Sequence, residues 1–342
     1  MTRRNSLAVF VALGCIGLPA FGQLSLTGAG ATFPEPMYTK WFDDYRKVHP
    51  DVQINYQGIG SGGGIRGVTE GTVDFGATDG PMTDEQLKAF RDKRGCGVLH
   101  FPTVLGGVVP VYNIPGVNAE LDFTPEALAG IFLGKITRWN DPAIANANPK
   151  VKLPGNDIIV VHRSDASGTT YVWVDFLSKI SDEWKTKVGR NTAVNWPTGL
   201  GGSKNEGVAG QVKQSANSIG YVELIYAAQN HMSFGRVRNS SGVFVKASLE
   251  SVTAAAAGVQ MPDDFRVSIT NPTGKNAYPI ASFTWLLVPE VIKDNQKRDV
   301  ITGFLHWMLG PGQKLTDALQ YAPLPKMVVT KEEKAIAKVR SS

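Results

Sequence analysis

The sequence predicts an α/β protein of about two lobes, each built on a largely parallel sheet. Its 342 residues are enough for about two domains that each bury a core. Strand and helix patterns alternate along the chain, as they do in α/β folds. Within this alternation, Ile158–Val161 is a run of four apolar, β-branched residues, which is typical of a strand covered on both faces.

Each predicted element starts from a local signal. Aromatic residues recur at helical spacing in Tyr38–Tyr45, and polar and apolar residues alternate in Val52–Tyr56, which favours a helix followed by a strand. Thr83 begins a capping box, and Thr124 precedes a proline in a first helical turn, so both positions predict helix starts. Apolar residues at helical spacing predict a late amphipathic helix over 300–308.

Composition excludes several classes of protein. A hydrophobic share of 42% is too high for intrinsic disorder, and only the tail Lys331–Ser342 is typical of disorder or of a short charged helix. Two cysteines exclude a disulfide-built miniprotein and a cysteine-built metal site. The five histidines are scattered without metal-ligand spacing, so we expect no metal.

The first 22 residues match a secretory signal peptide. Arg3 and Arg4 give a positive start, Leu7–Leu18 is apolar, and Ala20–Gly22 offers a small-x-small cleavage site before Gln23. The apolar stretch is shorter than the roughly 20 residues that span a bilayer. We therefore expect cleavage and export.

Alternatives to simple cleavage are a buried N-terminal helix and lipid attachment at Cys15. Ala12–Cys15 loosely fits a lipobox but lacks the usual leucine, so lipidation ranks lower. Cleavage leaves Cys96 as the only cysteine, in a predicted loop between Gly95 and Gly97. No histidine and no helix start lies beside it, so a catalytic thiol is not expected.

The charge of the mature chain argues against nucleic acid as a partner. Removal of residues 1–22 removes two arginines and no acidic residue, which leaves 33 basic and 30 acidic residues, a net charge of +3. No run of five or more basic residues occurs. The mature chain also lacks an apolar run of about 18 residues, so we do not expect it to cross a membrane.

Three glycine-rich loops each follow a strand pattern and open a helical pattern. They are Leu26–Pro34, Gly58–Gly64 and His162–Thr170. Such loops leave backbone N–H groups free at a helix N-terminus, where an anion binds well, and their Ser and Thr hydroxyls add donors. Each loop alone fits an ordinary turn, but strand ends in open α/β sheets converge on one crevice. None fits a nucleotide-binding fingerprint, so we expect no nucleotide and no cofactor.

Two charged positions indicate which anion fits. Arg163 ends the third strand, where its guanidinium could hold an oxyanion, and Asp165 could orient that guanidinium. Asp79 closes the strand pattern Val73–Thr78. An ionised carboxylate repels an anion unless the anion donates a proton to it, and phosphate carries a proton near neutral pH whereas sulfate does not. These residues therefore favour phosphate over sulfate.

Eight segments spread along the chain share a further pattern. They are Ser25–Pro34, Asn55–Gly64, Val73–Asp79, Phe101–Val109, Leu133–Asn140, Arg163–Thr170, Trp196–Gly202 and Ile219–Glu223. In order and content they resemble blocks of the periplasmic phosphate-binding proteins of Pst-type ABC transporters. The resemblance begins near Gln23 and thins in the last hundred residues. Mild departures fall at Gly62, Thr78 and Ala166, and none removes a side chain that the site needs.

The resemblance implies a set of phosphate ligands in each lobe. In the first lobe they are Thr32 (backbone and hydroxyl), Phe33 (backbone), Ser61 and Asp79. In the second lobe they are Arg163, Ser167, Gly168 and Thr169, with Asp165 pairing to Arg163.

The resemblance also implies a type II periplasmic binding protein with two crossover strands and a ligand cleft between its lobes. We place the crossings near 104–109 and 280–284. The first lobe then holds residues 23–104 and 282–342, and the second holds 105–281. Closure around the anion is expected to be a hinge motion.

The leading hypothesis is a binding protein and not an enzyme. It would capture inorganic phosphate in the periplasm, as a monomer, and deliver it to the permease and ATPase subunits of an inner-membrane ABC transporter. One alternative is an exported phosphatase with Ser61 or Ser167 as nucleophile, although no histidine lies near either serine in sequence. The other is a binding protein for another oxyanion such as sulfate, against which Asp79 argues.

Overall fold

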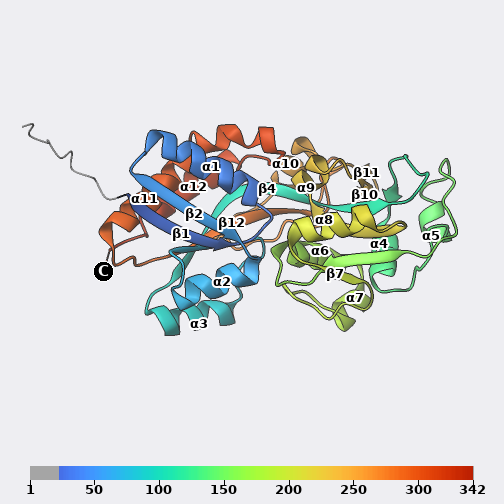
Figure 1. Ribbon diagram of the computed structural model, residues 1–342, viewed down its shortest axis with the longest axis horizontal. Coiled ribbons are helices and arrows are strands. Elements are labelled where there is room, and N and C mark those ends of the chain that lie inside the picture. The colour runs from blue at the N-terminus through green and yellow to red at the C-terminus, as the bar shows by residue number, and fades with distance from the viewer. Residues whose placement is uncertain (1–22, 342) are drawn as a thin grey trace, which may run out of the picture.

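The computed structural model describes residues 23–341 (Figure 1). The predicted signal peptide and Cys15 lie outside these residues, so both remain predictions. Two α/β halves lie side by side along the long axis, with the two chain ends of the described part in the same half (Figure 1). No helix in residues 23–341 combines the length and the apolar character needed to span a bilayer.

The first half, which contains β1 at the start of the described residues, has a sheet covered by helices from both ends of the described chain. Its elements are β1 (Leu24–Gly30), α1 (Glu35–Val48), β2 (Val52–Gly58), α2 (Ser61–Glu70), β3 (Phe75–Thr78), α3 (Asp84–Arg94), β12 (Ala281–Pro289), α11 (Asn295–Leu309), the short 3₁₀ helices η1 (Gly312–Leu315) and η2 (Asp317–Leu319), and α12 (Lys326–Ile336). The other half consists of the middle of the chain. Its elements are β5 (Asp122–Phe123), α4 (Pro125–Phe132), α5 (Pro142–Ala145), β6 (Ile159–Arg163), α6 (Gly168–Ile180), α7 (Asp182–Lys187), β7 (Leu200–Gly202), α8 (Lys204–Gln214), β8 (Ser218–Glu223), α9 (Leu224–Gln229), β9 (Ser233–Phe234), β10 (Arg236–Arg238), β11 (Phe244–Val245) and α10 (Leu249–Ala256).

One long strand, β4 (Val98–Asn113), belongs to both halves (Figure 1). It pairs with β12 up to Gly107 and with β8 from Val108 onward. This strand joins the two halves into one sheet of order β2-β1-β3-β12-β4-β8-β6-β7, with β9 beside β4. A separate small sheet has the order β11-β10-β5. The residue boundaries predicted for the lobes, 104/105 and 281/282, remain predictions.

The expectation of largely parallel sheets is wrong for the centre of the molecule. The outer pairs β1–β2, β1–β3, β6–β8 and β6–β7 are parallel, as expected. The pairs that β12 and β4 make with β3, β8 and each other are antiparallel. The strands β4 and β12 carry the chain from one half to the other. Each of them enters the sheet of the half that it reaches from the opposite end, so it runs antiparallel to the neighbouring strands there.

The local signals in the sequence placed several helices correctly. In α1 the buried side chains include Tyr38, Trp41, Phe42 and Tyr45, and α3 begins with the predicted capping box of Thr83. Thr124 caps α4 through the backbone N–H of Ala127, and α11 buries the expected apolar face.

One local expectation needs correction: Ile159 on β6 is 37% exposed, so this strand is covered on both faces only from Val160 onward. Of the two possibilities given for the tail, the structure shows the helix up to Ile336, because α12 continues through that residue and buries Glu332, Ala335 and Ile336 against the first half. The apolar residues at 328, 335, 336 and 339 supply the spacing that docks this helix.

Candidate functional site

The first wall of the site is the turn between β1 and α1. Gly30 lies against β3 so closely that a β-carbon there would be 2.1 Å from the carbonyl oxygen of Ala77, so only glycine fits. The chain then turns through Thr32 and Phe33, which are buried. Within residues 23–341 the backbone N–H groups of these two residues donate no hydrogen bond, whereas the Phe33 carbonyl accepts one from Tyr321 Oη at 2.6 Å. Two backbone donors are therefore available at this turn.

Ser61 and Asp79 form the second wall, at the ends of neighbouring elements. Ser61 is the first residue of α2, and Asp79 follows β3 directly. The backbone N–H of Asp79 donates to Ser61 Oγ at 3.2 Å, and Thr284 Oγ1 on the crossover strand β12 donates to Asp79 Oδ1 at 2.8 Å. The other carboxylate oxygen, Oδ2, is buried and has no hydrogen-bond partner among the described residues.

The opposite wall is the loop between β6 and α6. Arg163 ends β6 with its side chain 1% exposed, and it donates from Nε and Nη2 to the two oxygens of Asp165 at 2.7 and 2.5 Å. Ser167 caps α6 by accepting from the backbone N–H of Thr170 at 3.0 Å. Gly168 and Thr169 form the first helical turn, where backbone N–H groups have no partner within a helix.

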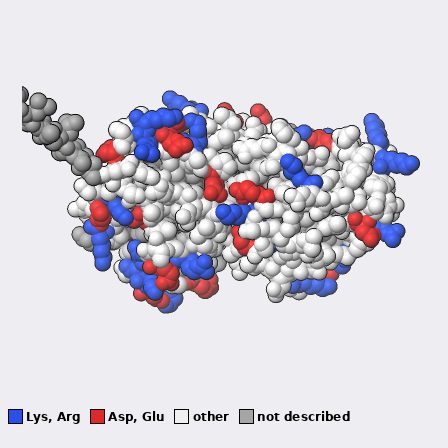
Figure 2. All heavy atoms as spheres, viewed as in Figure 1, with Lys and Arg blue, Asp and Glu red and all other residues white. Residues whose placement is uncertain are grey.

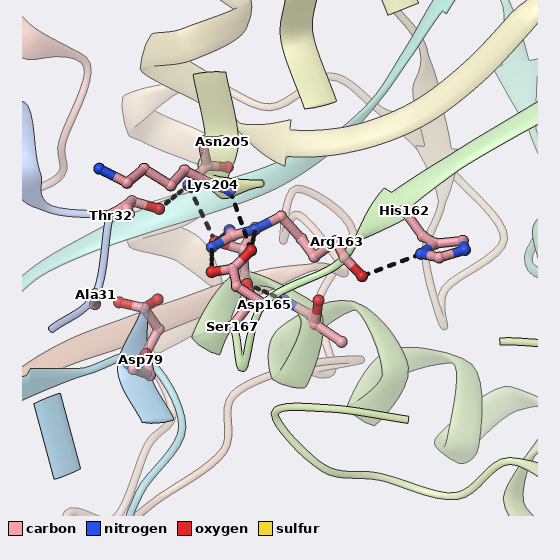
Figure 3. Close-up of polar contacts among 12 residues, drawn as sticks. Ala31, Thr32, Asp79, His162, Arg163, Asp165, Ser167, Lys204 and Asn205 are labelled. Carbon is pink, nitrogen blue, oxygen red and sulfur yellow. Dashed lines mark hydrogen bonds and ion pairs between the residues drawn. The ribbon is translucent and has the colours of Figure 1, made fainter. Parts of the chain in front are cut away.

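These walls meet in the middle of the molecule. A β-carbon at Gly168 would lie 2.3 Å from Ser61 Oγ and 2.4 Å from Asp79 Oδ2, so the two halves are closed on each other at this point. The backbone N–H of Gly62 also donates to the Ala166 carbonyl across the halves, at 2.9 Å. Figure 3 shows Asp79 facing the group formed by Arg163, Asp165, Ser167 and Thr32. The residues predicted as ligands therefore gather at one buried place, although their role as ligands remains a prediction.

The hydroxyl groups at this place all have the same hydrogen-bond role. Ser61, Ser167, Thr32 and Thr169 each accept a hydrogen bond from a protein N–H group. A hydroxyl that already accepts still has its own hydrogen to donate. The hydroxyl hydrogens of Thr32, Ser167 and Thr169 find no acceptor among the described residues, and that of Ser61 lies beside the Asp79 carboxyl, so the arrangement presents donors from both halves. Such an arrangement suits an oxyanion.

Asp79 is the acceptor among these donors. Burial raises its pKa to about 7, and the lowering effects of the Thr284 hydroxyl and the Arg163 charge do not cancel that rise. Arg163 and Asp165 pair with each other, and burial of Asp165 is outweighed by Arg163, which lowers the pKa of Asp165. The unpaired Oδ2 of Asp79 is therefore the atom that can take a hydrogen bond from a protonated ligand.

Several contributors to the site were not found from sequence. Asn205, near the start of α8, is fully buried and donates from Nδ2 to Thr32 Oγ1 at 2.9 Å and to Thr169 Oγ1 at 3.2 Å. Tyr221 on β8 accepts from the backbone N–H of Arg163 at 3.1 Å. The sequence signal nearest to Asn205 is the glycine- and serine-containing stretch 199–203, but most of it forms strand β7, which Ser203 alone joins to α8.

The structure shows the contacts of His162 and Cys96, two residues whose roles the sequence did not determine. His162 stacks on Trp196 with ring centroids 4.8 Å apart, its Nδ1 meets the Arg163 carbonyl, and burial lowers its pKa. It therefore packs against the site without adding charge to it. Cys96 follows the left-handed Gly95 that ends α3, and its thiol is partly buried in the first half, away from the residues above.

Open grooves flank the buried residues. One of about 460 Å³ lies between the halves and is lined by Glu35 of α1 and by Glu206 and Tyr226 of the other half. Acidic side chains are visible at the junction of the halves in Figure 2, and across this face lysines and arginines are interspersed with acids. The site itself is covered, since Ser61, Ser167 and Thr169 are each 0% exposed.

Comparisons with known proteins agree with this geometry. A family model described as a PBP superfamily domain matches residues 19–311. A protein of Xylella fastidiosa (strain Temecula1) named phosphate-binding protein PstS is 45% identical over 314 residues, which cover 91% of this chain and 84% of the relative. A protein of the same name from Haemophilus influenzae is 42% identical, with 92% of this chain and 93% of the relative covered.

The chain belongs to the PBP superfamily and, within it, to the PstS family. Solved structures support the two-lobed fold of this family. A phosphate-binding protein from Stenotrophomonas maltophilia aligns with a TM-score of 0.71 at 19% identity, covering 91% of this chain and 93% of that one. A high-affinity periplasmic phosphate-binding protein, PfluDING, solved with bound phosphate, gives a TM-score of 0.72 at 20% identity, with 92% and 93% covered. The predicted family and fold class are thereby confirmed.

Proposed function

We propose that this PstS-family chain binds inorganic phosphate with high affinity in the periplasm and delivers it to an inner-membrane ABC transporter. The observation that carries the proposal is the buried set of donors from both halves around a single unpaired acceptor, Asp79 Oδ2. A hydrogen phosphate ion has oxygens for the donors and a hydroxyl for the acceptor. The name of the 42–45% identical relatives, phosphate-binding protein PstS, supports the same ligand.

The proposed ligands are Thr32, Phe33, Ser61, Asp79, Arg163, Ser167, Gly168 and Thr169, with Asp165 as the partner of Arg163. Charge-assisted hydrogen bonds return roughly 1.5–3 kcal/mol each, against the cost of removing the anion from water. About ten such donors support an affinity near micromolar or tighter. The bidentate Asp165 pair occupies the Nε–Nη2 edge of the guanidinium, and Nη1 donates one N–H to Thr169 Oγ1, which leaves one N–H each on Nη1 and Nη2 for the anion.

The proposal is of a binding protein, with no reaction carried out at the site. Ser61 Oγ and Ser167 Oγ each accept from a backbone N–H, and neither has a hydrogen bond to a histidine among the described residues. The carboxyl beside Ser61 is that of Asp79, the acceptor proposed for the phosphate hydroxyl. Within residues 23–341 no group of three potential metal ligands occurs that could activate water. The relatives, too, are named as binding proteins.

We further propose that the chain works as a monomer and meets the permease and ATPase subunits of its transporter after export, with residues 1–22 removed. Its lobes would close on phosphate by bending at β4 and β12, the strands that join the halves.

Isothermal titration calorimetry on the purified protein, first stripped of endogenous phosphate, tests the ligand. We expect one phosphate per chain with an affinity of about 1 µM or tighter, and sulfate binding weaker by about 10⁴-fold or more. Equal affinity for the two ions would refute the proposed specificity. Release of product from a chromogenic phosphate ester without added metal would instead support the phosphatase alternative.

A further inference from the structure

Asn205 is a buried polar residue at the site that is not among the proposed phosphate ligands. It is fully buried at the first turn of α8 in the second half, and its side chain reaches Thr32 of the first half (Figure 3). The backbone before it is strained, since Lys204 has φ +62° without being glycine. That conformation lets the Lys204 N–H donate to Asp165 Oδ1 at 3.0 Å while the next side chain turns toward the other half.

The orientation of the Asn205 amide is fixed by its surroundings. The backbone N–H of Glu223 donates to Oδ1 at 3.1 Å, and a backbone N–H can only donate. The NH₂ group must therefore face Thr32 and Thr169, to whose hydroxyl oxygens it lies at 2.9 and 3.2 Å. Both threonine hydroxyls are thereby made acceptors toward Asn205.

A hydroxyl has one hydrogen and two lone pairs, so each threonine still has its hydrogen to donate. Thr169 Oγ1 also accepts from Arg163 Nη1 at 3.4 Å, which leaves it able only to donate to a further partner. Among the described residues neither hydroxyl hydrogen has an acceptor. Both hydrogens are thus free for a ligand that lies between the halves.

We infer that Asn205 is a positioning residue for the anion site: its amide holds the hydroxyls of Thr32 and Thr169 as donors toward the anion and joins the two halves when they close. This inference rests on the proposed function, because the donors need an oxyanion. Asn205 itself does not touch the anion. It gives affinity for oxyanions in general, whereas Asp79 separates phosphate from sulfate.

The sharpest test is Asn205→Asp, which keeps the shape of the side chain and reverses its role. One carboxylate oxygen still accepts from the Glu223 N–H, while the other replaces the NH₂ group and takes the hydrogens of both threonines. Two donors to the anion are lost and a negative charge is added. We expect the phosphate dissociation constant measured by calorimetry at pH 8 to rise by about 100-fold or more.

A matched control is Asn113→Asp. The amide of Asn113 donates to the carbonyls of Val212, Lys213 and Ser215 at the other end of α8, so the same chemical change loosens the same helix away from the site. We expect its phosphate affinity to match that of the unaltered protein. If both variants lose affinity equally, Asn205 only supports α8 and the inference is refuted.

A double-mutant cycle gives an independent test that does not depend on the charged variant folding. Phosphate affinity is measured for Asn205→Ala, for a variant that carries both Thr32→Val and Thr169→Val, and for a variant that carries all three substitutions. If the amide acts through the hydroxyls, its loss of about tenfold in affinity shrinks to about twofold or less when they are absent. Additive losses refute the inference. Failure of the unaltered protein to bind phosphate would refute the proposed function instead, so the two failures are distinguishable.

Discussion

The Asp79→Asn substitution tests the source of anion selectivity most directly. In the protein, Thr284 Oγ1 donates to Asp79 Oδ1 and leaves Oδ2 without a partner. In the variant, the amide oxygen keeps the bond to Thr284, so the NH₂ group takes the place of Oδ2. The carboxylate oxygen can only accept a hydrogen bond from a ligand hydroxyl, whereas the NH₂ group donates a hydrogen bond to an oxygen of any oxyanion.

The size of the effect follows from what the carboxylate excludes. A site built around a ligand hydroxyl rejects an analogue without one by about 10⁴–10⁵. At pH 8 the carboxyl, with a pKa of about 7, is mostly ionised, so sulfate must also pull a proton onto it at a cost of about tenfold. In the variant we expect the ratio of sulfate to phosphate dissociation constants to fall below about 10², because sulfate binds about tenfold more tightly once no proton has to be taken up and phosphate loses the acceptor for its hydroxyl.

Competition calorimetry with phosphate and sulfate at pH 8 measures this ratio. Asp74→Asn is the matched control, because it removes the same charge from the same half at a carboxylate that bonds Thr27 and Lys297 away from the site. A folded Asp79→Asn variant with unchanged sulfate affinity would show that the selectivity has another origin.

Four other outcomes are expected. In the unaltered protein, sulfate binding should tighten about tenfold between pH 8 and pH 6 as the carboxyl with pKa about 7 gains its proton, and the Asp79→Asn variant should show no such change in pH-dependent calorimetry. Gly168→Ala should weaken phosphate binding by about 100-fold or more and leave the protein open in small-angle scattering, because the new methyl group would lie 2.4 Å from Asp79 Oδ2 only when the halves close. Arg163→Lys should raise the phosphate dissociation constant by about 30-fold or more in the same titration, because an ammonium group cannot make the two-point pair with Asp165 and still reach the anion. Glu332→Gln should raise the melting temperature by a few degrees at pH 8 but not at pH 4: burial raises the pKa of this unpaired carboxyl, so its cost to stability appears only above the pKa of the unfolded chain, and an equal gain at both pH values would contradict this reasoning.

The sequence by itself determined the local parts of this protein. Capping residues placed the starts of α3 and α4, and aromatic spacing placed the buried face of α1, because these signals act within a few residues along the chain. The three glycine-rich loops indicated an anion site for the same reason. The family resemblance then extended these local signals to a set of candidate ligands.

The tertiary structure decided how these parts meet. The antiparallel course of β4 and β12, the burial of α12 and the contact of Gly168 with Asp79 all join residues far apart in the chain. Asn205 was missed because its role depends on three partners, Thr32, Thr169 and the Glu223 N–H, that come together only when the halves close. Hydrogen-bond direction is a property of such a group of neighbours, and no pattern within one segment of sequence carries it.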